Sequence, residues 1–169
     1  MSSLADDFRA AFRSHPAGVA LVTANPHGRP VGLTISSLAS LSIDPVAVSF
    51  SLTRSSGSAG ALLQSPTFMI HLLGEQHSSV ADAFARPDGE RFSSEQQWQY
   101  LENGEPYFDQ APVAMRARMH SSLQVGGSRL IAAEILDIFH GPTDQHLLYQ
   151  DRRYLGLSTA LHLEQGQRK

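Results

Sequence analysis

Small hydroxyl side chains and one arginine gather between residues 34 and 58, and together they could bind a polar, anionic ligand. Hydroxyls and backbone N–H groups at strand ends bind a flat polar ligand without adding bulk, and an arginine beside them pairs with phosphate. Residues 54–58 read Arg-Ser-Ser-Gly-Ser and stand where a strand should end and a helix begin, which offers free N–H groups to an anion. An ordinary serine-rich turn is the alternative. The residues concerned are Thr34, Ser36, Ser37, Ser40, Ser42, Ser49, Ser51, Arg54, Ser55, Ser56 and Ser58.

Other common catalytic patterns are missing from the sequence. Eight histidines are present, but none stands in a zinc-ligand spacing such as His-Glu-x-x-His, so we expect no metal site. The chain has no cysteine, which excludes disulfides, a Cys-ligated metal and a thiol nucleophile. It also lacks a Gly-x-Ser-x-Gly elbow, a Gly-x-Gly-x-x-Gly fingerprint and a P-loop.

The charge balance argues against nucleic-acid and membrane partners. The 169 residues carry 13 Lys+Arg and 16 Asp+Glu, with a net charge of −3 and no basic cluster. No uncharged apolar run approaches the ~20 residues that a membrane helix needs. Acidic residues stand near the N-terminus where a secretion signal would carry basic ones, so we expect a cytoplasmic protein. We expect one domain over residues 1–169, with its core at about 8–157 and a polar tail at 164–169.

Hydrophobic spacing predicts mostly strands around the hydroxyl cluster. Apolar residues at helical spacing predict a helix before residue 15, capped by Ser3 and Asp6. A short helical stretch should end near residue 64, another helix should cover 76–85, and the aromatic residues of the loop at 86–112 should fold back over the protein. Strands are expected at 17–24, 30–37, 46–52, 66–73, 113–125, 128–140 and 146–150.

The segment 113–125 has the clearest strand pattern, and the pair Gly126-Gly127 after it predicts a tight hairpin. Closely spaced strands without a β-α-β rhythm predict a mainly β fold, a small antiparallel barrel with short peripheral helices. The residues expected on one face of this strand are Val113, Met115, Ala117, Met119, Leu123 and Val125.

Several segments resemble the flavin reductase-like family, whose members bind FMN in a split β-barrel. The segments come in the family's order and cover the chain from residue 8 to about 157. Each is weakly specific alone, but their order and spacing identify the family. They are Phe-Arg-Ser-His-Pro-Ala-Gly-Val at 12–19, Thr23, Gly-Leu-Thr-Ile-Ser-Ser-Leu at 32–38, Ser-Leu-Ser-Ile-Asp-Pro at 40–45, Arg-Ser-Ser at 54–56, Phe-Met-Ile-His-Leu-Leu at 68–73 and Phe-Ala at 84–85.

The resemblance implies an antiparallel, Greek-key-like split β-barrel that forms a homodimer with flavin near the interface. It implies an NAD(P)H-dependent flavin reductase that uses FMN or FAD, with NADH or NADPH as co-substrate. The family includes reductase partners of flavin-dependent monooxygenases, so such a partner is expected here. Hydride transfer from nicotinamide to flavin needs alignment of two rings rather than an acid or base, so we name no catalytic residue.

The resemblance also assigns parts of the flavin to segments of this chain. The segment 32–37 lies along the isoalloxazine and ribityl chain, 49–51 faces the flavin, and 54–58 holds the phosphate. The cofactor-binding residues are therefore expected to be Gly32, Leu33, Thr34, Ile35, Ser36, Ser37, Ser49, Phe50, Ser51, Arg54, Ser55 and Ser58.

Two positions depart from the family pattern. Members often have Gly-Asp-His at the hairpin after the long strand, where this chain has Gly126-Gly127-Ser128-Arg129. Because arginine pairs well with dinucleotide phosphates, we expect Arg129 on the nicotinamide side. The usual asparagine of the strand at 66–73 is His71. The missing histidine leaves two alternatives open: a flavin- or haem-binding split barrel without reductase activity, and a dimerisation module without a ligand.

Overall fold

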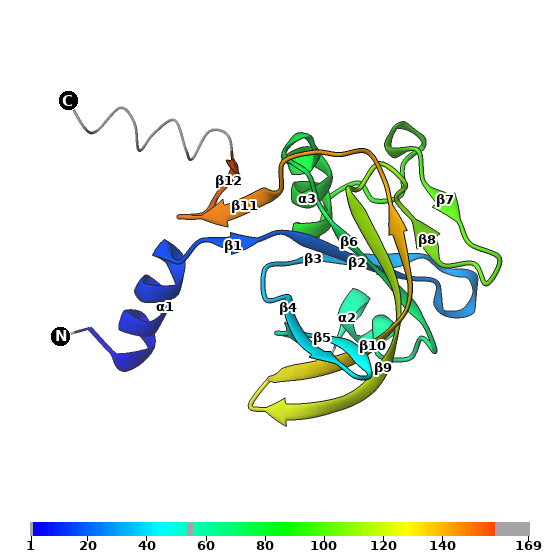
Figure 1. The fold of residues 1–169 in the computed structure, drawn as a ribbon. Helices are drawn as coiled ribbons and strands as arrows, with labels where there is room; N and C mark the ends of the chain where they lie inside the picture. Colours follow the sequence, from blue (N-terminus) through cyan, green and yellow to red (C-terminus); the bar gives the residue numbers. More distant parts are fainter. Residues whose placement is uncertain (1, 54–55, 158–169) are drawn as a thin grey trace.

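The computed structural model describes residues 2–53 and 56–157, and its main feature is a curved sheet of seven strands (Figure 1). The strand order is β3-β2-β6-β9-β10-β5-β4, and each neighbouring pair is antiparallel. The predicted mainly β, antiparallel fold is therefore confirmed, with β4 as a strand that the sequence had not indicated. The strands are β2 (Ala20–Ala24), β3 (Val31–Ile35), β4 (Ala39–Ile43), β5 (Val46–Leu52), β6 (Phe68–Leu72), β9 (Val113–Val125) and β10 (Ser128–His140).

A small second sheet flanks the large one. The predicted strand at 17–24 is divided at Val19, whose N–H donates to the Leu147 carbonyl at 3.0 Å. The Val19 carbonyl accepts from the Leu73 N–H at 3.1 Å, so the chain passes there from the small sheet to the large one. The small sheet has the order β1-β11-β12, with β1 (Ala17–Gly18), β11 (Leu147–Gln150) and β12 (Arg153–Gly156).

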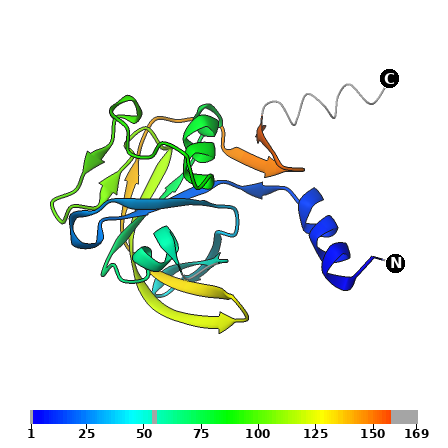
Figure 2. The same cartoon turned by 180° about the vertical axis from the view of Figure 1, so that it is seen from behind.

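The helix α1 (Leu4–Ser14) projects from the curved sheet (Figures 1 and 2). Its N-terminus has the predicted capping box between Ser3 and Asp6, but none of its residues is buried. The turn between β11 and β12 holds its other end, because the Asp151 N–H donates to the Arg13 carbonyl at 2.8 Å. The other helices are α2 (Gly57–Leu62) and α3 (Ser78–Ala85), with 3-10 turns η1 (Pro26–Gly28), η2 (Glu75–His77) and η3 (Ser94–Gln96).

The long strand β9 departs from the predicted alternation. Its register against β10 shifts between Met119 and Ser121, so His120 is an extra residue in a β-bulge. An extra residue turns the following side chains to the opposite face. The prediction that Leu123 and Val125 share a face with Met115 is therefore wrong, and the two side chains are 60 % and 64 % exposed.

Two hydrophobic clusters form the core. The first fills the curved sheet, where the rings of Phe50 and Phe68 meet edge to face with centroids 6.0 Å apart. The second lies under the segment 86–112, which includes β7 (Gln99–Tyr100) and β8 (Pro106–Tyr107). There Trp98 packs against Phe84 and Phe108, so the predicted folding back of this aromatic loop is confirmed.

Two buried polar side chains hold the segment 86–112 to the sheet. The Glu105 carboxylate, 3 % exposed, accepts from Arg116 Nε at 2.7 Å and from the Thr67 hydroxyl. Fully buried His71 places Nδ1 3.2 Å from the Leu21 carbonyl, and its Nε2 accepts from the Phe108 N–H at 3.1 Å. Burial lowers the pKa of His71 to about 4, so the ring is neutral at pH 7.

Candidate functional site

The predicted hydroxyl cluster comes together where β3 and β5 end. Ser37 Oγ accepts a hydrogen bond from the Ser51 N–H at 2.9 Å and donates to the Ser51 carbonyl at 3.3 Å. This pair of bonds joins the connection after β3 to the last residues of β5. Ser36 is exposed beside it, so two hydroxyls and the nearby backbone form one polar wall.

This wall borders a large cleft between the sheet and α1, with a volume of about 1220 Å³. A single small-molecule site usually occupies roughly 300–1,000 Å³, so the cleft has room for more than one ligand group. Arg9 and Arg13 line it on the helix side, and each lies close to a carboxylate, with Arg9 2.8 Å from Asp6. The wall on the sheet side consists of Ser36, Ser37, Leu38, Ser51 and Thr53.

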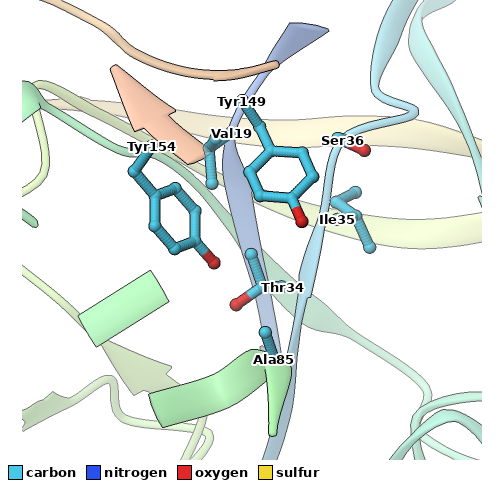
Figure 3. A pocket seen from close by; sticks show the side chains of 7 residues that line it. All are labelled: Val19, Thr34, Ile35, Ser36, Ala85, Tyr149 and Tyr154. Atoms are coloured by element: carbon cyan, nitrogen blue, oxygen red, sulfur yellow. The ribbon is translucent and has the colours of Figure 1, made fainter. Parts of the chain in front are cut away.

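A narrow slot of about 180 Å³ adjoins the cleft (Figure 3). Tyr149 and Tyr154 form one side of it, and their hydroxyls point toward Thr34 and Ala85. Ser36 and Tyr149 line both the slot and the cleft, so the two spaces are neighbours. Val19 and Ile35 complete the slot as apolar lining, and the slot suits a small flat ring.

Four of the predicted cofactor residues have packing roles for their side chains. A Cβ on Gly32 would lie 2.6 Å from the Phe84 ring, so glycine lets α3 approach β3. Phe50 is completely buried, and Leu33 packs against the same core cluster. Ile35 is 6 % exposed but also lines the slot. These residues pack behind the wall and hold it in place. The exposed hydroxyls are the groups that can form hydrogen bonds with a ligand.

Thr34 and Ser49 hold different positions. Thr34 lines the slot while its hydroxyl donates to the Ala81 carbonyl at 2.6 Å, which ties β3 to α3. Ser49 is half-buried on β5, on the same face as Ser51, and it lines neither the slot nor the cleft. The structure thus brings Thr34, Ser36, Ser37 and Ser51 to the two spaces and leaves Ser49 beside them.

An arginine that the sequence did not single out lies at the predicted phosphate segment. Arg91 Nη1 donates to Ser58 Oγ at 2.9 Å, and Nη2 donates to the Arg86 carbonyl at 2.7 Å. Its buried Nε has no hydrogen-bond partner in the described residues. A guanidinium with a spare donor beside a serine hydroxyl fits an anionic group such as phosphate. Arg54 and Ser55, the other predicted ligands, lie outside the described residues.

Arg129 lies opposite Leu52, which stands between the cleft residues Ser51 and Thr53. Its Nη1 donates to Ser122 Oγ at 3.0 Å, and its backbone is in register with Leu52 at the end of β5. It lines neither the slot nor the cleft. Its placement on the nicotinamide side therefore stays a prediction.

Residues 2–53 and 56–157 also bear on metal binding and on membrane insertion. No group of three or more His, Asp or Glu side chains in these ranges could hold a metal ion. Within the same ranges, no helix is long and apolar enough to cross a membrane.

Comparison with known proteins matches almost all of the chain. The family described as "flavin reductase like domain" matches residues 12–158. An NADH:FMN oxidoreductase of Rhodococcus qingshengii is 37 % identical over 154 residues, which are 89 % of this chain and 80 % of that protein.

Solved structures give the same result for the fold. A flavin reductase domain protein from Arthrobacter sp. FB24 superposes with a TM-score of 0.83 and 30 % identity, covering 89 % of this chain and 93 % of that one. The flavin reductase of the styrene monooxygenase from Pseudomonas putida S12 superposes with a TM-score of 0.78 and 27 % identity. The match covers 89 % of this chain and 96 % of that one. The architecture is therefore the split barrel of these proteins.

Proposed function

This chain belongs to the flavin reductase-like domain family, and from that premise we propose that it reduces FMN with NADH as a homodimer. It is an NAD(P)H:flavin oxidoreductase, like the NADH:FMN oxidoreductase that is 37 % identical to it over 89 % of this chain. FAD and NADPH are the second choices for the two substrates. The observation that carries the proposal is the polar wall of Ser36, Ser37 and Ser51 along a cleft large enough for two ligands.

The residues of this chain bind and orient, and the flavin supplies the redox chemistry when bound. The hydroxyls and backbone of Ser36 and Ser37 are suited to the polar edge of a flavin ring. Ser58 and Arg91 are suited to its phosphate, together with the predicted ligands Arg54 and Ser55. The cleft holds a second ligand against the first, and alignment of two reactants is a large part of catalysis by itself.

Two exposed apolar surfaces support a dimer. The first is on α1, where Leu4, Phe8 and Phe12 are each at least 60 % exposed. Phe8 and Phe12 also line the large cleft, so a second copy that packs on α1 borders the ligand space. The second is on the β9–β10 hairpin, where the exposed side chains Leu123 and Leu130 face each other in register near Val125. Monomeric proteins rarely expose such contiguous apolar patches. We therefore infer that a second copy of this chain covers them.

A monooxygenase partner is supported by the relative from Pseudomonas putida S12, which is the reductase of styrene monooxygenase. We propose that reduced flavin from this chain is passed to an oxygenase of the same kind.

The function is tested by NADH consumption with purified protein and added FMN, followed beside free FMN without protein. We expect turnover well above the protein-free control, and faster turnover with FMN than with FAD. The same assay with NADPH identifies the preferred dinucleotide. Consumption equal to that of free flavin with either dinucleotide would contradict reductase activity. In that case a bound flavin spectrum would support the non-catalytic alternative.

A further inference from the structure

The backbone is strained where the loop after α3 reaches α2. Phe92 has a φ angle of 57°, in the left-handed region that favours glycine. A bulky aromatic residue keeps this conformation only where its surroundings compensate the local cost. The residue before it, Arg91, donates to Ser58 Oγ at 2.9 Å and to the Arg86 carbonyl at 2.7 Å. The strained residue therefore directly follows the guanidinium that is suited to the flavin phosphate.

Aromatic packing is one part of what compensates the strain at Phe92. The ring centroids of Phe84 and Trp98 each lie 5.0 Å from that of Phe92, and the Phe84 ring meets it nearly at a right angle, 85°. The guanidinium carbon of Arg91 lies 6.0 Å from the centroid of the same Phe84 ring. Phe84 thus packs against both residues of the pair Arg91–Phe92.

The side-chain amide of Gln96 holds the backbone on both sides of this pair. Its Nε2 donates to the carbonyl of Glu90, the residue before the pair, at 3.0 Å. Its Oε1 accepts from the N–H of Ser93, the residue after the pair, at 3.2 Å. The same Oε1 accepts from Trp98 Nε1 at 2.9 Å, which joins the amide to the aromatic rings.

An ordinary helix cap explains only one of these three bonds. Gln96 is the third residue of η3 after the N-cap Ser93, where a glutamine commonly accepts from the N-cap N–H. The bonds to the Glu90 carbonyl and to Trp98 Nε1 contribute nothing to that cap. They fix the loop on the side of Arg91, so the amide has a second role there.

We propose that Gln96 is a positioning residue for the flavin phosphate: its amide clamps the strained pair Arg91–Phe92 and so aims Arg91 at Ser58. The inference rests on the proposed function, because Gln96 acts through the arginine assigned there to the phosphate. Gln96 lines neither the slot nor the cleft. Without the clamp the loop must be ordered when the phosphate binds, and that ordering lowers the affinity.

The test is a titration of Gln96→Met with FMN and with riboflavin, which lacks the phosphate. Methionine keeps the side-chain length and removes the amide. We expect the dissociation constant for FMN to rise about five- to tenfold and that for riboflavin to stay unchanged. Gln110→Met is the matched control, because its exposed amide lies in the same segment and donates only to Gln97 Oε1, at 2.8 Å. It should change neither constant.

Combination with Arg91→Ala distinguishes positioning from general support of the fold. Because Gln96 acts through Arg91, Gln96→Met should have no further effect on FMN binding once Arg91→Ala is present. Phe92→Leu is a second variant, which reduces the ring contacts and keeps the amide, and it should give the same pattern. If urea unfolding shows that Gln96→Met is too unstable to titrate, Phe92→Leu decides.

The outcomes separate the inference from the function on which it rests. If Arg91→Ala binds FMN as tightly as wild type, the phosphate assignment fails and the inference fails with it. If Arg91→Ala weakens FMN alone and Gln96→Met binds FMN like wild type, only the inference is overturned. Equal losses for FMN and riboflavin in Gln96→Met, or an effect that adds to that of Arg91→Ala, would also overturn it, because the amide would then support the fold and not the arginine.

Discussion

The guanidinium of Arg91 donates a hydrogen bond to Ser58 Oγ over 2.9 Å, although the two residues are 33 positions apart in the sequence. The contact brings a positive charge from the loop after α3 to the start of α2. Nη1 and Nη2 of Arg91 are already bonded and Nε is buried, so the pair offers an anion the positive charge of the guanidinium and the Ser58 hydroxyl.

Arg91→Ala should weaken FMN binding by about 1.5–3 kcal/mol, the range for hydrogen bonds that involve a charged group. Riboflavin, which lacks the phosphate, should bind wild type and variant equally, as measured by quenching of flavin fluorescence. Arg86→Ala is the control, because that exposed arginine pairs with Asp82. An equal loss for riboflavin would mean that Arg91 supports the fold and not the phosphate.

Glu105→Gln should lower the free energy of unfolding by about 2 kcal/mol. Burial by itself would raise the pKa of Glu105. The hydrogen bonds from Thr67 and Arg116 outweigh burial and lower the pKa, so the carboxylate is charged at neutral pH. Removing the charge leaves Arg116 with only Asp137, at 3.6 Å.

Urea unfolding followed by tryptophan fluorescence measures this change. The matched control is Glu134→Gln, whose partner Arg118 is 56 % exposed, and its effect should stay within about 0.5 kcal/mol. Equal effects of the two substitutions would show that the buried pair contributes no more than a surface pair.

His71 should make the protein sensitive to mild acid. Its pKa is about 4 in the folded protein and 6.5 when unperturbed, so the unfolded chain binds a proton first as pH falls. The contribution of neutral His71 to the free energy of unfolding is therefore complete above pH 6.5. It is lost progressively as the pH falls to 4, by up to about 3 kcal/mol.

His71→Asn should remove this pH dependence, because an amide also donates and accepts hydrogen bonds but does not titrate. His71→Ala should lose about 2–4 kcal/mol at neutral pH, since the Leu21 carbonyl and the Phe108 N–H are left without a partner. Unfolding curves at several pH values check both outcomes. If the free energy of unfolding of His71→Asn falls between pH 6.5 and 4 as it does in wild type, the pH dependence belongs to other groups.

Leu123→Glu should convert the proposed dimer to a monomer, because a charge within the apolar surface of the β9–β10 hairpin is costly to bury. Light scattering should give about twice 18.4 kDa for wild type and 18.4 kDa for the variant. Tyr100→Glu, at an exposed aromatic residue on β7, should remain a dimer. A monomeric wild type that binds FMN tightly would contradict the dimer.

Local patterns predicted much of what the structure contains. Alternation in β5 predicts one inward face of Val46, Val48, Phe50 and Leu52. Val48, Phe50 and Leu52 are buried, because strand alternation is a short-range property, whereas Val46 at the start of the strand is 47 % exposed. The Ser37 hydroxyl bonds to the backbone N–H and carbonyl of Ser51, so the two serines lie side by side at strand ends. The single domain, the cytoplasmic location and the role of Arg129 stay predictions.

Local sequence patterns could not predict the long-range contacts. The bulge at His120 could not be predicted from the sequence, because Leu123 and Val125 resume the original alternation after it and only the pairing with β10 reveals the extra residue. Arg91 stands between Glu90 and Phe92 in a charged loop, with no local feature that marks it as a partner of Ser58.

The sequence by itself determined the mainly β class, the family and the clustering of hydroxyl residues, because strand periodicity and motif order are written along the chain. Only the tertiary structure decided which side chains meet at the ligand spaces. Arg91 reaches Ser58, and Arg152 enters the cleft beside α1, because loop closure and a strained hairpin turn bring distant segments together. Such approaches depend on how the whole sheet curves, which no short stretch of residues specifies.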